Sequence, residues 1–277
     1  MPSYICTTCG VGYAETEAPR EVCLICADDR QYVNARGQRW TTLEALREDH
    51  VNELRELEPG LLGVGSSPQV AIGQRALVIQ RPEGGVMWDC TPLVTDAALG
   101  AIRAKGGVKA MAISHPHFYS SMVDWSRALG DVPIYLHEDN RDWVMRPDPA
   151  IQFWTGESKV IADGVSLIRT GGHFPGSTVL HWAAGAGGKG ALLTGDSIMV
   201  VPDTRWVSFM YSYPNLIPLP AETVLHIAEA VQPWPFDRIY GAWWGRNVLE
   251  HAKESVRRSA ERYVAAMSAT AAGMHRT

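Results

Sequence analysis

The chain has 277 residues, of which 46% are hydrophobic and 20% charged, and its formal net charge is −5. These values are ordinary for a soluble globular protein with one large domain and room for a small appendage. The acidic balance and the lack of a Lys/Arg run argue against nucleic acid as a partner. Because no apolar stretch is long enough to span a bilayer and no signal-peptide pattern opens the chain, we expect no membrane contact and a cytoplasmic protein.

Four of the five cysteines lie within the first 26 residues. Cys6, Cys9, Cys23 and Cys26 form two Cys-x-x-Cys knuckles separated by 13 residues. In a reducing compartment, cysteine pairs of this kind are more often metal ligands than disulfides. Four thiolates suit one tetrahedral ion. Cys90 stands alone, and we expect it to be a small buried apolar residue.

The knuckle segment, residues 4–33, resembles the short rubredoxin-like zinc ribbon at the ends of rubrerythrins. The likeness lies in the pattern Tyr4-x-Cys6-x-x-Cys9-Gly10 and in an Ala-Pro pair ahead of the second knuckle. It implies a metal unit with four cysteine ligands over residues 1–35. A structural zinc ion is the interpretation that we favour for this unit, with an iron electron-transfer centre as the alternative.

The next stretch, residues 36–60, predicts a connecting helix. Thr41-Thr42-Leu43-Glu44 has the spacing of a capping box, and leucines recur at helical intervals up to Leu57. Pro59-Gly60 is a stop signal for that helix.

From residue 61 onward, short apolar runs alternate with helical patterns, which predicts an α/β domain over 61–277. We expect a helix within 94–107 and a long amphipathic C-terminal helix over 247–269. The predicted strands are 75–80, 85–90, 108–114, 132–137 and 166–173, followed by a hairpin over 178–197.

Residues that can bind a metal follow three of these strands. His115 and His117 come directly after one, His173 after another and Asp196 after a third. Side chains just past strand ends converge on one rim of a sheet. In an extended His-x-His segment both imidazoles point the same way, so the pair can bind one ion.

The ordered motifs His-x-His, "GGHFPGSTVLHW" and "TGDS" resemble the metallo-β-lactamase superfamily, with the glyoxalase II-like branch nearest in texture. The resemblance covers roughly residues 61–250 and implies an αββα sandwich. It also implies that His115, His117 and His173 hold the first metal, that Asp196 is the carboxylate that bridges two metals, and that Gly176 and Ser177 shape the loop of the third histidine. His181 matches a strand position rather than a ligand.

The ligands of a second metal are replaced in this sequence. The superfamily pattern His-x-His-x-Asp-His has Tyr119 and Ser120 at its last two positions, and Trp243-Trp244 stands where a late histidine is usual. Because Asp196 alone would bind a second ion poorly, we expect one metal at this centre. The tryptophan pair favours an apolar pocket wall and a hydrophobic or aromatic small-molecule substrate.

The leading functional hypothesis is a zinc-dependent hydrolase of an ester, thioester, lactone or amide. Three histidines and a water are a ligand set that activates that water. Asp196 would bind the ion or the water. Tyr119 is a candidate hydrogen-bond donor, and Asp124 is a candidate acid or base.

Two alternatives stay open from the sequence. His115, His173 and Asp196 form a two-histidine-one-carboxylate set, which is typical of mononuclear non-haem iron oxygenases, and the resemblance extends to persulfide dioxygenases. The third possibility is a binding protein that lost catalysis together with its second metal.

Overall fold

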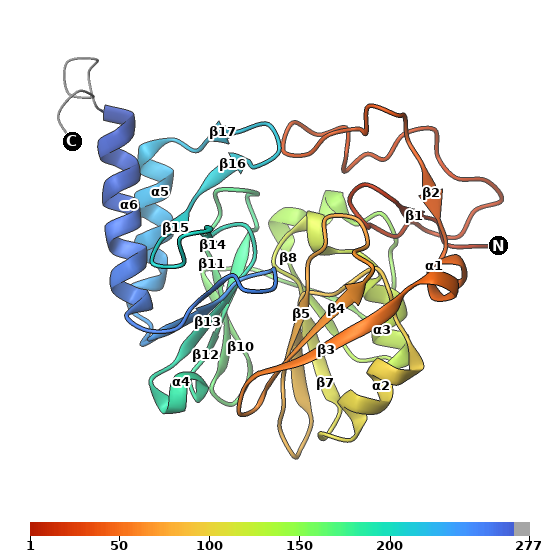
Figure 1. Cartoon of the computed structure of the whole chain (residues 1–277), viewed down its shortest axis with the longest axis horizontal. Helices are drawn as coiled ribbons and strands as arrows, with labels where there is room; N and C mark the ends of the chain where they lie inside the picture. The colour runs from red at the N-terminus through yellow and green to blue at the C-terminus, as the bar shows by residue number, and fades with distance from the viewer. Residues whose placement is uncertain (269–277) are drawn as a thin grey trace.

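The structure is a computed structural model that describes residues 1–268. Two β-sheets lie face to face, with helices on both outer faces and the N-terminal segment across one end (Figure 1). The seven-stranded sheet contains, from edge to edge, β3 (Val51–Glu58), β4 (Leu61–Ser67), β5 (Ala76–Ile79), β6 (Gly85–Trp88), β7 (Val108–Ala112), β8 (Ile134–His137) and β9 (Ile151–Trp154). The six-stranded sheet contains β10 (Ser158–Ala162), β11 (Val165–Arg169), β12 (Thr178–Trp182), β13 (Ala191–Thr194), β18 (Arg238–Tyr240) and β19 (Asn247–Val248). The predicted αββα architecture is confirmed.

Three apolar layers hold this sandwich together. The layer between the sheets includes Leu77, Trp88, Leu180 and Leu193, all essentially buried. A second layer lies under α2 (Asp96–Arg103) and α3 (Met122–Ala128), and a third lies under α5 (Ala221–Val231) and α6 (Ala252–Ser268). Because central strands such as β5 are buried on both faces, their sequences are continuous apolar runs rather than alternating ones.

Short elements complete the chain. They are α1 (Leu43–Asp49), α4 (Gly185–Gly188), the 3-10 helices η1 (Pro116–Phe118) and η2 (Glu138–Trp143), and the two-stranded pairs β14 (Met199–Val200) with β15 (Val207–Ser208) and β16 (Met210–Ser212) with β17 (Ile217–Pro218).

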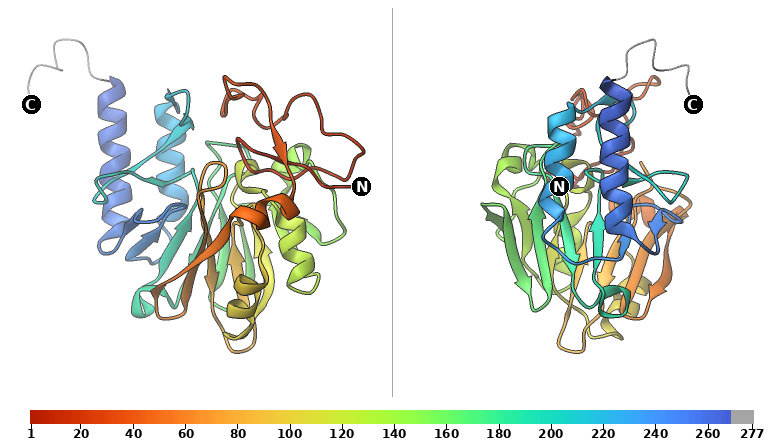
Figure 2. Two further views of the ribbon diagram at one scale, coloured as in Figure 1. Left: turned by 45° about the vertical axis from the view of Figure 1, so that its right-hand side comes forward. Right: turned by 90° about the vertical axis from the view of Figure 1, so that its left-hand side faces the viewer.

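The N-terminal unit has little regular structure of its own. Its strand β1 (Ile5–Cys6) pairs with β2 (Trp40–Thr41), and its apolar cluster consists of the four knuckle cysteines with Val11, Tyr13 and Ile25. The unit lies above the end of the sandwich at which β7 finishes, as the two further views show (Figure 2).

The connecting helix predicted for residues 36–60 is wrong over most of its length. Only Leu43–Asp49 is helical, capped by the Thr42 side chain, which accepts a hydrogen bond from the backbone N–H of Ala45 at 3.3 Å. Residues 51–58 form β3 instead, paired antiparallel with β4 across a turn at Gly60, where φ is +86°. The spacing of the leucines is that of a helix. Pairing with β4, however, gives the backbone N–H and C=O groups of residues 51–58 their hydrogen bonds, and the segment is a strand. The sandwich therefore begins at Val51 rather than at residue 61.

The C-terminal helix begins later than the sequence predicted. Asn247–Val248 forms the edge strand β19, and Asp237 then accepts from the backbone N–H groups of His251 and Ala252 at 2.9 and 3.1 Å. These acceptors set the start of α6 at Ala252. The last predicted residue of the helix, Ala269, lies outside the described residues.

We expect Gly65→Ala to destabilise the protein by about 1–3 kcal/mol, because a methyl carbon at Gly65 would lie 2.7 Å from the indole Nε1 of Trp244. The matched control is Gly100→Ala in α2, where an added methyl meets nothing within 4 Å and a gain of about 0.5–1 kcal/mol is expected. Urea unfolding of both variants measures the difference. If Gly65→Ala were as stable as the wild type, this packing of Trp244 would be contradicted.

Candidate metal centres

The four knuckle thiols form one compact cluster. The Sγ atoms of Cys6 and Cys26 are 3.6 Å apart and those of Cys9 and Cys23 are 3.7 Å apart. A disulfide would need about 2.05 Å, whereas a tetrahedral ion with metal–sulfur bonds of about 2.3 Å holds its sulfurs about 3.8 Å apart. The four cysteines therefore fit one ion and are free of disulfides.

Hydrogen bonds to the sulfurs hold this cluster in shape. The Gln38 side-chain amide donates to the Sγ of Cys6 at 3.2 Å, and the Tyr13 hydroxyl donates to the Sγ of Cys23 at 3.3 Å. Gly10 turns the chain with φ of +83° and donates to the carbonyl of Cys6. Burial raises the pKa of the Cys9 thiol well above its usual value, so a cation is needed to keep all four sulfurs ionised together.

A second cluster forms where strands of the two sheets end at the same rim. His115 and His117 follow β7, His173 follows β11 and Asp196 follows β13. The Thr178 N–H donates to the carbonyl of Ser114 at 3.0 Å and ties the two sheets together here. All four ligand atoms lie within 4.8 Å of one another.

The distances within this cluster match one four-coordinate ion. The Oδ2 of Asp196 lies 3.3 Å from His115 Nε2, 3.9 Å from His117 Nδ1 and 3.6 Å from His173 Nε2. His173 Nε2 and His117 Nδ1 are 3.1 Å apart. Donors around a tetrahedral ion with bonds of about 2.0–2.1 Å stand about 3.3–3.4 Å apart, so the residues present fit a metal such as zinc.

Two neighbours orient the histidines. Ser114 Oγ lies 2.9 Å from the Nδ1 of His115, and the carbonyl of Met210 lies 3.1 Å from the Nδ1 of His173. Each contact engages one ring nitrogen and leaves Nε2 aimed at the centre. Within residues 1–268 the buried His115 Nε2 and Asp196 Oδ1 have no hydrogen-bond partner, which fits donors that serve a metal rather than a neighbouring side chain.

The protonation states suit metal binding. Burial lowers the pKa of His117 to about 4 and holds that of His173 well below its usual value, so both rings are neutral near pH 7. Burial alone would raise the pKa of the Asp196 carboxyl, but the histidines around it, His115 first, hold that pKa well below its usual range. Asp196 is therefore a carboxylate.

Backbone constraints fix the position of Asp196. The Tyr213 hydroxyl donates to the carbonyl of Asp196 at 2.7 Å. Gly195 is required beside it, because a methyl carbon there would lie 2.5 Å from Ser114 Oγ and 3.2 Å from His115 Nδ1.

The loop of the third histidine is held by two further contacts. Ser177 Oγ accepts from the N–H of Phe174 at 2.9 Å, and the Gly176 N–H donates to Asn140 Oδ1 at 3.0 Å. Both residues therefore shape the surroundings of His173, as their motif position implied.

Asp89 supports the site and was missed in the sequence. It follows β6, and its Oδ1 accepts from the backbone N–H of Ser114 at 2.8 Å, one residue before His115. Burial raises the pKa of this carboxyl to about 8. An acidic residue at the end of an apolar strand was the available signal. Its neighbour Cys90 is buried, as expected, and packs against the backbone of Phe118 and Tyr119.

The two residues that replace second-metal ligands are engaged elsewhere. Tyr119 is buried and its hydroxyl donates to the carbonyl of Asn140 at 3.4 Å. Ser120 Oγ accepts from Gln74 Nε2 at 3.0 Å and donates to the carbonyl of Gly10 at 3.3 Å. Asp124, on α3, pairs with Arg146 at 2.7 Å. Catalytic roles for Tyr119 and Asp124 stay predictions, and these contacts do not favour them.

The tryptophan pair does not form a pocket wall beside the four donors. Trp244 lies against β4 between Arg55 and Arg75, whose guanidinium carbons are 4.5 and 5.2 Å from its ring. The indole N–H of Trp243 donates to the carbonyl of Ile72 at 2.9 Å, and its ring meets Phe118 edge-on. Trp243 therefore packs against Phe118, the residue that follows His117, and not against the four donors.

Two further histidines, His137 and His181, have structural roles. His181 lies in β12, as expected for its motif position, and its Nε2 is 2.7 Å from the carbonyl of Pro235. His137 accepts from the N–H of Asp139 and lies 3.2 Å from the carbonyl of Gly156.

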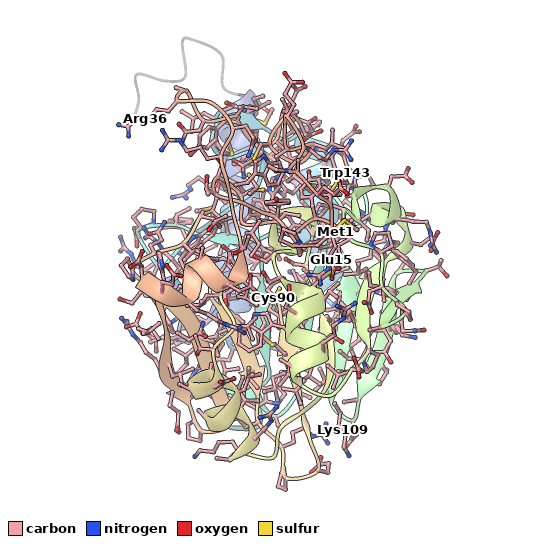
Figure 3. The ribbon with its side chains drawn as sticks, turned by 90° about the vertical axis from the view of Figure 1, so that its right-hand side faces the viewer. Met1, Glu15, Arg36, Cys90, Lys109 and Trp143 are labelled. Atoms are coloured by element: carbon pink, nitrogen blue, oxygen red, sulfur yellow. The ribbon has the colours of Figure 1, made fainter. Side chains whose placement is uncertain are left out.

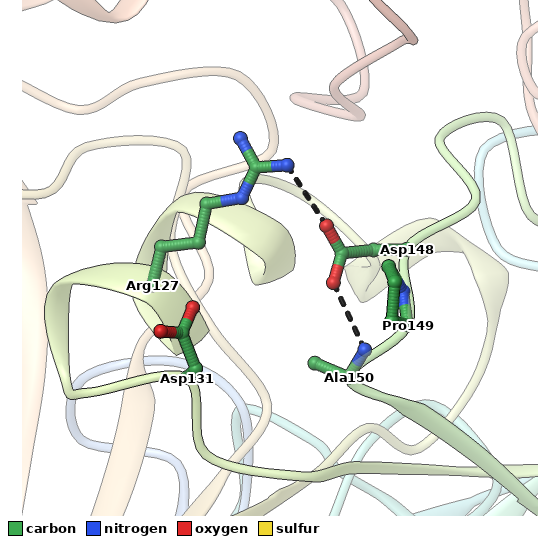
Figure 4. Close-up of a pocket in the computed structure, with 5 residues that line it drawn as sticks. All are labelled: Arg127, Asp131, Asp148, Pro149 and Ala150. Atoms are coloured by element: carbon green, nitrogen blue, oxygen red, sulfur yellow. Dashed lines mark hydrogen bonds and ion pairs between the residues drawn. The ribbon is translucent and has the colours of Figure 1, made fainter.

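Five surface hollows lie away from the metal centre. Five hollows of about 70–430 Å³ in the described chain are all lined by other residues than the four His and Asp donors. One is bordered by Arg127, Asp131 and Asp148, with Asp148 joined to Arg127 and to the N–H of Ala150 at 2.9 Å each (Figure 4). Among residues 1–268, no helix is long and apolar enough to cross a membrane.

Comparison with solved structures places this arrangement in a known fold. VMB-1 superposes with a TM-score of 0.60 at 15% identity, covering 78% of this chain and 98% of its own. FIM-1 from Pseudomonas aeruginosa, in its mono-zinc form, gives 0.57 at 13% identity over 77% and 96%. A metallo-β-lactamase from Pontibacter korlensis gives 0.54 at 17% identity over 75% and 99%. At these identities the likeness establishes the fold alone.

Sequence comparison gives a much nearer relative, although no family model matches the chain. The uncharacterised protein YmaE of Bacillus subtilis (strain 168) is 50% identical over 270 residues, which is 97% of this chain and 98% of YmaE. The two proteins thus correspond over the N-terminal segment and the sandwich alike. The chain belongs to the family of YmaE, and its own fold is that of the metallo-β-lactamases.

Proposed function

We propose that this protein is a single-metal hydrolase that uses water to cleave an ester, thioester, lactone or amide. The observation that carries the proposal is the convergence of His115 Nε2, His117 Nδ1, His173 Nε2 and Asp196 Oδ2 at spacings that suit one ion. The solved FIM-1 structure has this fold in a mono-zinc form, which supports zinc and a single ion here. When bound, such an ion supplies a Lewis acid that polarises a carbonyl and acidifies water.

The chain's own residues would perform the remaining tasks. Ser114 and Met210 hold His115 and His173 so that their Nε2 atoms stay aimed at the centre. With four protein donors present, the water would have to add as a fifth. Asp196 has a free oxygen, Oδ1, which can accept a hydrogen bond from that water and orient it. Because the pKa of Asp196 is held low, this carboxylate suits orientation of the water better than storage of its proton.

The number of bound ions tests the ligand assignment. Elemental analysis of the loaded protein should find one ion for the four-cysteine cluster and one for the His and Asp cluster. His115→Ala should lose the second ion and Cys6→Ser the first, since each removes a ligand from a four-donor set. His226→Ala, at an exposed position of α5, is the matched control and should keep both. An unchanged metal content in His115→Ala would overturn the proposal.

Catalysis should depend on Asp196 more than metal retention does. In Asp196→Asn the amide oxygen remains as a neutral donor beside the three histidines, so the ion stays bound, while hydrolysis falls by roughly 10²–10⁴-fold because the water loses its carboxylate acceptor. The measurement is kcat/KM on a panel of chromogenic esters, thioesters, lactones and amides. Asp203→Asn, on the surface beside Arg205, should match the wild type. A fully loaded wild type that hydrolyses none of the four classes would contradict the hydrolase and favour the binding protein.

A mononuclear iron oxygenase is the second candidate, and two observations favour it. The Oδ2 of Asp196 lies 3.3 and 3.6 Å from His115 and His173, which is a compact two-histidine-one-carboxylate set. The donors are also deeply buried, and dioxygen is a co-substrate small enough to reach such a centre. Oxygen uptake with thiols and persulfides after anaerobic loading with Fe(II), and not after loading with zinc, would select this candidate.

A further inference from the structure

The metal centre is closed off from solvent in this structure. His115, His117 and His173 are 0%, 2% and 1% exposed, and Asp196 is 6% exposed. A hydrolytic centre must admit a substrate, so whatever covers these residues decides what reaches the ion.

The cover is the N-terminal four-cysteine unit. The Gly12 N–H donates to the carbonyl of Ser120 at 2.9 Å, and Ser120 Oγ donates to the carbonyl of Gly10 at 3.3 Å. On the opposite side, Asn215 Nδ2 donates to the carbonyls of Asp29 and Gln31 at 2.8 and 2.9 Å. The unit thus spans from the turn that follows His117 to the β16–β17 loop, above the strand ends (Figures 1 and 2).

One side chain of the unit contacts the backbone of a ligand residue. The Arg30 guanidinium carbon lies 4.0 Å from the centre of the Phe174 ring and 5.2 and 5.3 Å from the rings of Tyr211 and Trp143. Its Nη1 donates to the backbone carbonyl of the ligand His173 at 3.4 Å.

The surroundings of Arg30 hold it in that position. Its Nε and Nη2 donate to the two oxygens of Asp28 at 2.6 and 2.9 Å, so the guanidinium is fixed in orientation. The Phe174 ring under Arg30 lies 5.0–5.8 Å from the rings of all three histidine ligands. Arg30 therefore stands one aromatic ring away from the donors.

The shape of the cover depends on its own metal. Its apolar cluster consists mainly of the four cysteines, and its regular structure is the two-residue pair β1 and β2. A unit of this size buries too little apolar surface to fold alone, and bound metal supplies the missing free energy in such domains. Residues 28–31 begin two positions after Cys26, the last cysteine ligand, so loss of that ion would release the segment that carries Arg30.

We propose that the four-cysteine unit is the cap of the His and Asp metal centre, that Arg30 is the positioning residue that keeps the cap closed, and that the ion of the four cysteines controls access to the second ion. The inference rests on the proposed function, because a hydrolase has a substrate that the cap must admit.

Hydrogen–deuterium exchange of the full chain tests the cap. In Arg30→Ala, the backbone amides of residues 115–120 and 171–177 should exchange about ten-fold faster than in the wild type, as local opening becomes easier. Arg30→Lys keeps the charge but loses the two-pronged contact to Asp28, so an intermediate rate is expected. The matched control is Arg36→Ala, at an exposed position between the last cysteine and β2 and well away from Trp143 (Figure 3), which should behave as the wild type.

Loss of the ion held by the four cysteines should have the same effect as loss of Arg30. Cys26→Ser should expose the same two segments while β5 and β6 keep their protection, which separates opening of the cap from global unfolding. In both variants a chelator should extract the ion of the His and Asp centre about ten-fold faster than in the wild type.

Unchanged exchange and unchanged ion release in Arg30→Ala and Cys26→Ser would overturn the cap, even if the wild type hydrolyses esters. Conversely, faster exchange in both variants of a protein that hydrolyses nothing would keep the cap and refute only the hydrolase. Exchange is measured whether or not the second centre holds an ion, so either result decides the proposal.

Discussion

The structure depends on the convergence of three imidazoles and one carboxylate in the buried interior, where their charges and lone pairs have to be balanced. Unpartnered buried polar atoms cost about 1–3 kcal/mol each, and His115 Nε2 and Asp196 Oδ1 are such atoms among the described residues. A bound cation gives these atoms a partner, so the free energy of metal binding offsets this cost. The joined strand ends, the glycine at 195 and the contacts from Ser114 and Met210 all serve to keep the donors aimed at one point.

Much of this could be predicted from the sequence, because the residues that bind metal belong to local backbone patterns. A His-x-His step after an apolar strand and two closely spaced Cys-x-x-Cys knuckles place their side chains through short-range geometry alone. The order of the motifs then led to the αββα fold and to the grouping of His173 and Asp196 with the first two histidines, which the structure brings together.

The contacts that sequence reasoning missed are those between segments far apart in the chain. The sequence of residues 51–58 gives no local sign that a partner strand will form hydrogen bonds with their backbone. Their helical leucine spacing therefore predicted the wrong element. Arg30 has its aromatic neighbours at positions 143, 174 and 211, and a single surface-like Arg between two Asp and a Gln gives no sign of them. Trp244 likewise found its place against glycines 63 and 65 of another strand.

The position of the four-cysteine unit ahead of the sandwich has a consequence for assembly during translation. All four cysteine ligands are made before residue 27, whereas Asp196 follows after a further delay on the order of ten seconds at about 5–20 residues per second. The knuckles can therefore take up their ion while the second centre does not yet exist. Since the finished unit lies across the strand ends, the order of events at the ribosome decides whether the inner ion binds before the unit settles over its site or has to wait until the unit lifts away.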